Sequence, residues 1–170
     1  MNQEPLHIHN LHGSLGHKVR DYYPLIGMLG VVLALTTLSV IMFSQDAMTA
    51  FMGWFFLVFG GLKIIRLHDF VQAYKMYDVI AKHITTYAYL YPFLEFGAGL
   101  AYLLVWNITL VSAIVLPILL ISAYGVYLKV RQNEAVPCAC LGTVFKVPMT
   151  WVTLGEDLLM ALMALMMLFM

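Results

Sequence analysis

The stretch "PLIGMLGVVLALTTLSVIMF", residues 24–43, contains no charged side chain. A helix of roughly 20 apolar residues is long enough to cross the hydrocarbon core of a bilayer. The whole chain of 170 residues is 62% hydrophobic and 11% charged, with a mean hydropathy of +0.87. Soluble domains contain about 25% charged residues. Since so few charges cannot cover a soluble globule, we predict an all-α integral membrane protein.

Four further stretches are apolar enough to span a membrane. They are residues 49–65, 86–106, 108–128 and 151–170. The sequence therefore predicts five transmembrane helices. The first 23 residues are polar, whereas a cleavable signal peptide needs an early apolar region. We predict a polar, His-rich tail over residues 1–23, a retained anchor over 24–43 and a four-helix membrane domain over 49–170.

The basic residues predict the orientation of the chain. The links at 44–48 and at Asn107 contain no Lys or Arg. All nine basic residues lie in or beside the other connections: Lys18, Arg20, Lys63, Arg66, Lys75, Lys82, Lys129, Arg131 and Lys146. Short cytoplasmic loops are enriched in such residues. We expect a multi-pass protein of a bacterial-type inner (plasma) membrane, with a cytoplasmic amino terminus and a cytoplasmic connection between the last two spans. The zero net charge argues against nucleic acid as a partner.

The segment between the second and third spans is amphipathic. In "IIRLHDFVQAYKMYDVIAK", residues 64–82, apolar and polar side chains alternate at helical spacing. The apolar face comprises Ile64, Leu67, Val71 and Tyr74, and the polar face comprises Arg66, Asp69, Gln72 and Lys75. This pattern favours an interfacial helix in the headgroup layer over a simple continuation of the second span into water.

Two charged residues fall inside predicted spans, where charges are costly and often functional. Glu95 follows Pro92 and shares a helix face with Gly99, while Lys63 lies three residues after Gly60. We predict a Lys63–Glu95 pair that supports the bundle. In the alternative, Lys63 extends to the headgroups and Glu95 stays neutral as a hydrogen-bond donor. Such a pair could set helix register without taking part in chemistry.

Glu156 and Asp157 open the last predicted span. Acidic side chains in the first turn of a helix are stabilised by its dipole. This interpretation is favoured over a metal site.

The only two cysteines are Cys138 and Cys140, in "VPCACLGT", residues 136–143. A cytoplasmic disulfide is usually transient and catalytic, and a Cys-x-Cys ring should be strained and easily reduced. Both are therefore candidate catalytic residues for thiol exchange. Adjacent thiolates also suit Cu(I) or another soft metal, with further ligands from the tail: His7, His9, His12 and His17. The simplest alternative is a pair of loop thiols and a polar tail without a site.

Four short motifs occur in the order typical of one family. They are "FGGLK" at 59–63, "DF" at 69–70, "YPFLEFGAGL" at 91–100 and "PCACLG" at 137–142. Together the motifs resemble those of the MauE-like, DoxX-related redox-associated membrane proteins, over about residues 50–170. The resemblance implies that the last four spans form the family's helical bundle. It also implies thiol–disulfide exchange or maturation of a disulfide-containing partner.

The resemblance leads to a first hypothesis, in which the chain is a membrane thiol–disulfide redox component without a cofactor. It would relay electrons or mature a partner, and a thioredoxin-like protein is one such partner. Whether this amounts to a thiol–disulfide oxidoreductase stays open. The second hypothesis is a soft-metal binding or transport protein, of the copper or mercury type. The third is a scaffold in the lipid bilayer without chemistry. The extra first span, the His-rich tail and the cytoplasmic cysteines depart from the family's pattern.

Overall fold

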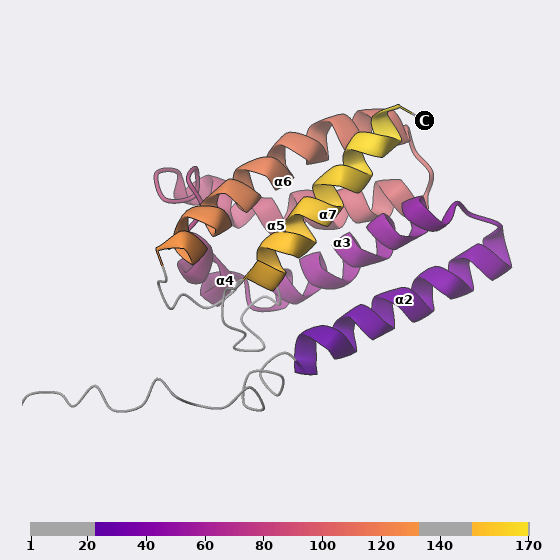
Figure 1. Cartoon of the computed structure of the whole chain (residues 1–170), viewed down its shortest axis with the longest axis horizontal. Helices are drawn as coiled ribbons and strands as arrows, with labels where there is room; N and C mark the ends of the chain where they lie inside the picture. The colour runs from indigo at the N-terminus through magenta and orange to yellow at the C-terminus, as the bar shows by residue number, and fades with distance from the viewer. Residues whose placement is uncertain (1–22, 133–150, 170) are drawn as a thin grey trace, which may run out of the picture.

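A computed structural model describes residues 23–132 and 151–169, and all regular structure in these two ranges is helical (Figure 1). In chain order the helices are α2 (Tyr23–Phe43), α3 (Ala47–Ile65), α4 (Leu67–Tyr74), α5 (Thr85–Leu103), α6 (Ile108–Arg131) and α7 (Trp151–Leu168). Within the described part, α2, α3 and α6 are long and apolar enough to cross a membrane. The expected all-α architecture is confirmed, and the protein is a multi-pass helical membrane protein. The two other expected spans correspond to α5 and α7, which are not among the three helices that meet this length and hydropathy criterion.

Side-chain caps explain why the two short links can reverse the chain. At the start of α3, Asp46 Oδ2 accepts hydrogen bonds from the backbone amides of Met48 (3.0 Å) and Thr49 (3.1 Å). At the start of α6, Asn107 has a φ of 39° and its side chain accepts from the amide of Leu110 at 3.3 Å. Asparagine tolerates this left-handed conformation better than most residues. Each cap satisfies amides that would otherwise lack a partner at a helix start.

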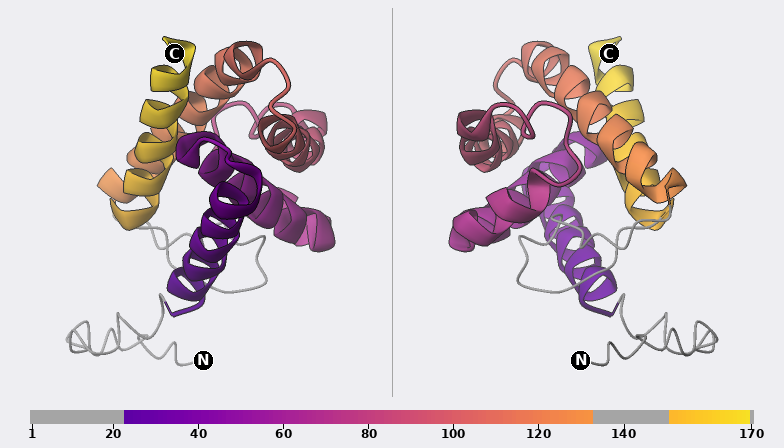
Figure 2. Two further views of the ribbon diagram at one scale, coloured as in Figure 1. Left: turned by 90° about the vertical axis from the view of Figure 1, so that its right-hand side faces the viewer. Right: turned by 90° about the vertical axis from the view of Figure 1, so that its left-hand side faces the viewer.

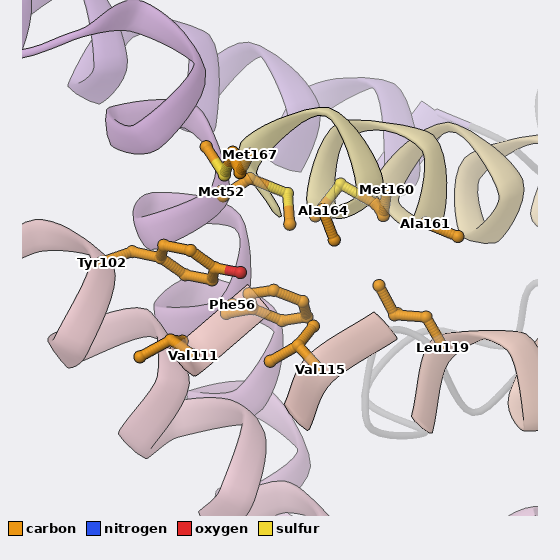
Figure 3. Close-up of a cluster of buried hydrophobic side chains, with 10 residues drawn as sticks. All are labelled: Met52, Phe56, Tyr102, Val111, Val115, Leu119, Met160, Ala161, Ala164 and Met167. Carbon is orange, nitrogen blue, oxygen red and sulfur yellow. The ribbon is translucent and has the colours of Figure 1, made fainter. Parts of the chain in front are cut away.

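The helices pack in two principal pairs, α3 with α5 and α6 with α7. The anchor helix α2 packs against α3, and α4 packs against α5 (Figures 1 and 2). An apolar core joins the two principal pairs. Figure 3 shows its ten buried members: Met52, Phe56, Tyr102, Val111, Val115, Leu119, Met160, Ala161, Ala164 and Met167. This core fixes α7 against the α3–α5 pair and so positions the polar site described below.

Glycines allow α3 and α5 to approach closely. A Cβ added to Gly99 would lie 2.7 Å from the backbone nitrogen of Leu57 and 2.9 Å from the backbone oxygen of Gly53. A Cβ added to Gly60 would lie 3.1 Å from the backbone nitrogen of Phe96. Small residues at such positions let helix backbones pack against one another in membranes.

The amphipathic segment forms a separate helix and does not continue α3. α3 ends at Ile65, and Arg66 leaves the helical conformation with a φ of −118° and a ψ of 46°. The helix that follows, α4, covers eight residues and is shorter than the repeat in the sequence suggested. Turns then follow, in which Asp78 Oδ1 accepts from the amides of Ile80 (2.9 Å) and Ala81 (2.7 Å). The segment is thus packed as part of the bundle, while its depth in the headgroup layer stays a prediction.

Candidate functional site

Lys63 of α3 and Glu95 of α5 form a buried ion pair. The ammonium Nζ lies 2.7 Å from Glu95 Oε1 and 2.6 Å from Oε2, so one lysine donates to both carboxylate oxygens. Only 7% of Lys63 and 8% of Glu95 are exposed. The ion pair expected from the sequence is therefore present, and the alternative in which Lys63 extends to the headgroups is wrong. The close approach at Gly60 brings the two helices near enough for this contact.

Aromatic rings surround the ammonium group. Lys63 Nζ lies 5.1 Å from the ring centroid of Tyr91 on α5 and 5.6 Å from that of Phe70 on α4. The negative face of an aromatic ring attracts a cation, most strongly where water is excluded. These contacts offset part of the cost of removing the charge from water, a cost that a buried ion pair does not always recover.

A cavity of about 40 Å³ adjoins the ion pair and has room for a water molecule. It lies where α4, the carboxyl-terminal part of α6 and the start of α7 meet the α3–α5 pair. Its polar lining consists of Lys63, Tyr74, Tyr77, Tyr91, Glu95, Ser122, Glu156 and Asp157. Three carboxyl groups and one ammonium group therefore share one small polar space.

The position of Glu156 and Asp157 corrects their interpretation from the sequence. α7 begins at Trp151, and its first turn contains no acidic residue. Because both acids lie in the second turn, stabilisation by the helix dipole does not account for them. They line the polar cavity instead, where Asp157 interacts electrostatically with Lys63, Glu95 and Glu156.

Buried polar groups without partners lie beside the pair, in the aromatic cluster between α4 and α5. Tyr74 is 1% exposed, and its ring stacks against those of Phe70 and Tyr91, with centroids 5.0 and 4.7 Å away. Burial raises the pKa of the Tyr74 hydroxyl well above its usual value, so this group stays neutral. Within residues 23–132 and 151–169, neither this hydroxyl, that of Tyr87, nor Asp78 Oδ2 has a hydrogen-bond partner.

A second cavity, of about 250 Å³, lies between α5 and α6. Its lining is almost wholly apolar and includes Phe93, Ala98, Val111 and Leu119. Glu95 lines both cavities. The carboxylate of the ion pair therefore stands between a small polar space and a larger apolar one.

The candidate thiols and the alternative metal ligands lie outside the described residues. This applies to Cys138 and Cys140 and to the four tail histidines, His7, His9, His12 and His17. The cysteines belong to the segment that links Arg131, where α6 ends, to Trp151, where α7 begins. Within residues 23–132 and 151–169, no three His, Cys, Asp or Glu side chains are arranged to hold a metal ion.

Sequence reasoning missed two members of the site. Tyr91 belongs to the run "TTYAYLY" at 85–91, which is typical of a membrane-interface belt, but it is only 3% exposed and faces Lys63. Tyr91 precedes Glu95 by four residues, and residues four apart share a helix face, so this spacing could have indicated that Tyr91 lies beside the ion pair. For Asp157 no such signal exists, since its distance from Lys63 depends on how α7 packs against α3.

Comparison with known proteins gives one match. A family model described as "Methylamine utilisation protein MauE" matches residues 36–170. The matched region includes every residue of the ion pair and of the polar cavity, and it includes the two cysteines. No curated protein and no solved structure matches the chain.

Proposed function

Since the chain belongs to the methylamine utilisation protein MauE family, we propose that it is a membrane component of thiol–disulfide exchange, with Cys138 and Cys140 as the exchanging thiols. The observation that carries the proposal is the buried Lys63–Glu95 pair inside the matched region. The adjoining cavity reaches the start of α7 and the last turns of α6, between which the cysteine-bearing segment runs. The charged site and both ends of that segment thus belong to the same part of the bundle.

The proposed reaction needs only the two thiols and a partner's disulfide. The thiolate of one cysteine attacks a sulfur of the partner's disulfide, which forms a mixed disulfide and releases the partner's other sulfur as a thiolate. The second cysteine then attacks the mixed disulfide and releases the partner. The partner's disulfide is reduced and the Cys138–Cys140 pair is oxidised. Run in reverse, the same steps oxidise the partner.

In this scheme Lys63 and Glu95 do not react with the partner's disulfide; they hold the helices of the bundle in place. Their ion pair joins α3 to α5 beside the cavity to which α6 and α7 contribute. A buried pair of this kind favours one arrangement of the helices, because any shift would leave two charges unpaired. We assign both residues a positioning role.

The exchange should be visible as a trapped intermediate. Replacing one cysteine, as Cys138→Ser or Cys140→Ser, removes the thiol that resolves the mixed disulfide. We expect one of these variants, expressed in its host, to accumulate a covalent adduct with a thioredoxin-like or disulfide-containing protein. Non-reducing electrophoresis followed by mass spectrometry identifies the adduct, and Cys138→Ser/Cys140→Ser is the matched control. Absence of adducts in both single variants, with a pair that never oxidises in cells, would refute the redox function.

The proposal includes a topology with five spans, in which α5 and α7 cross the membrane together with α2, α3 and α6. The anchor over 24–43 then precedes a four-helix domain over 49–170, and α4 lies at the interface. The tail over 1–23 and the cysteines face the cytoplasm, as the positions of the basic residues indicate.

Maleimide labelling of intact cells tests this orientation. After reduction, Cys138 and Cys140 should react with a membrane-permeant maleimide and not with an impermeant one. Cells opened by sonication provide the control, since both reagents should then label the pair. Labelling of intact cells by the impermeant reagent would place the cysteines outside and reverse the topology.

A further inference from the structure

The polar cavity contains more negative than positive groups. Glu95, Glu156 and Asp157 line it together with one ammonium group, that of Lys63. Both hydrogen bonds from Lys63 go to Glu95, so this pair is neutral as a unit. Among the described residues Asp157 forms no ion pair, although it interacts electrostatically with Lys63, Glu95 and Glu156. One ammonium group therefore faces three carboxyl groups, and it forms its ion pair with only one of them.

An excess of negative charge in a buried cavity can be neutralised by a bound cation or by a bound proton. A metal ion needs several ligands that converge on one point, and no group of three acidic, histidine or cysteine side chains does so in the described part of the chain. A proton needs only one carboxyl group. Low polarity and neighbouring carboxylates both favour the protonated form of an acid. The geometry therefore favours a proton.

A second feature of the cavity points the same way. Tyr74 lines the cavity and is 1% exposed, yet its hydroxyl has no hydrogen-bond partner among the described residues. Buried hydroxyls usually have a partner, which in many proteins is an ordered water. The cavity is large enough for water and polar on the side of the acids. It thus offers an acceptor for a proton and room for a water molecule beside that acceptor.

We propose that this cavity is a proton-binding site, in which Asp157 holds the proton beside the Lys63–Glu95 ion pair. The polar groups that line the cavity together with Asp157 are Lys63 from α3, Glu95 and Tyr91 from α5, Tyr74 from α4, Tyr77 from the following turn, Ser122 from α6 and Glu156 from α7 itself. Loss of the proton creates a second carboxylate that attracts Lys63. The ammonium group then has two competing partners, and proton release loosens the link between α3 and α5. The site does not depend on the thiols.

Infrared spectroscopy of the full-length protein in lipid nanodiscs tests the proposal. The C=O stretch of a protonated carboxyl group is distinct from the carboxylate bands and shifts in D₂O. Between about pH 5 and about pH 9, well above the ordinary range of Asp and Glu, we expect the wild-type protein to lose one such band. The variant Asp157→Asn should lack this band over the same pH range. Asp69→Asn, which removes an exposed acid on α4 outside the cavity, should keep the band and is the control.

A second variant tests the link to the ion pair. In Lys63→Met the Glu95 carboxyl loses the cation with which it pairs, so an additional protonated band should appear, and it should disappear in Lys63→Met/Glu95→Gln. Circular dichroism and size-exclusion profiles confirm that each variant is folded. A wild-type spectrum without a titrating carboxyl band in this pH range would overturn the proposal. So would a band that persists unchanged in folded Asp157→Asn.

Discussion

Replacing Lys63 with methionine should lower the free energy of unfolding by about 3–5 kcal/mol, the cost of breaking a buried ion pair by removing one partner. The reason is the position of Glu95, which is 8% exposed and accepts both hydrogen bonds from Lys63 Nζ. Without the ammonium group, this carboxyl must either remain as an unpaired charge or take up a proton. Equilibrium unfolding of the detergent-solubilised protein, followed by circular dichroism, measures the change.

Glu95→Gln and the double variant Lys63→Met/Glu95→Gln complete a double-mutant cycle. Each single change should destabilise the protein more than the double change does, because the double variant leaves no unpaired charge. Arg66→Met is the surface control, since the Arg66–Asp69 pair at 3.3 Å is exposed and its loss should cost less than about 1 kcal/mol. If Lys63→Met and Arg66→Met cost the same, the ion pair does not stabilise the bundle, and the positioning role fails.

The same variants separate stability from redox function. Under the positioning role, the double variant should recover the formation of mixed disulfides together with its stability. If the double variant is stable but no longer forms mixed disulfides, the charges themselves are needed for exchange. This outcome would contradict the assignment of Lys63 and Glu95 as positioning residues.

The ion pair could be predicted because its two members are conspicuous in sequence. Lys63 and Glu95 are charged residues in two apolar stretches that predict consecutive transmembrane helices. Charges inside a membrane must find a partner or lose their charge, and few candidates were available. The all-α architecture followed from composition for a similar physical reason, since only helices and closed barrels satisfy every backbone group in lipid.

The rest of the site could not be predicted, because it depends on how helices that are distant in sequence pack together. Nothing in the sequence indicates that Asp157 interacts with Lys63. Because α7 begins at Trp151, Glu156 and Asp157 lie in its second turn and not in its first. Tyr91 belongs to a run typical of a membrane-interface belt, and its contact and that of Phe70 with Lys63 depend on how α4 packs against α5. The amphipathic repeat of residues 64–82 also overestimated the length of α4, since Asp78 stabilises turns within that segment by accepting two amide hydrogen bonds.

Substituting Gly99 should separate α3 from α5. A Cβ at this position would lie 2.7 Å from the backbone nitrogen of Leu57 and 2.9 Å from the backbone oxygen of Gly53. Since both contacts are to backbone, no side chain can rotate away, and the helices themselves must move apart. We expect Gly99→Ala to lower the free energy of unfolding by about 1–3 kcal/mol, the usual cost of overpacking, and Gly99→Val to cost more.

Gly97→Ala is the matched control on the same helix. A Cβ at Gly97 has nothing within 4 Å, and alanine is favoured over glycine within a helix by roughly 0.5–1 kcal/mol. This variant should therefore be as stable as the wild type or slightly more so. Because the Lys63–Glu95 pair bridges the same two helices, a shift caused by Gly99→Val should also weaken the ion pair. Combining Gly99→Val with Lys63→Met should then cost less than the sum of the two single changes. Full additivity would show that the glycine contact and the ion pair hold the two helices independently.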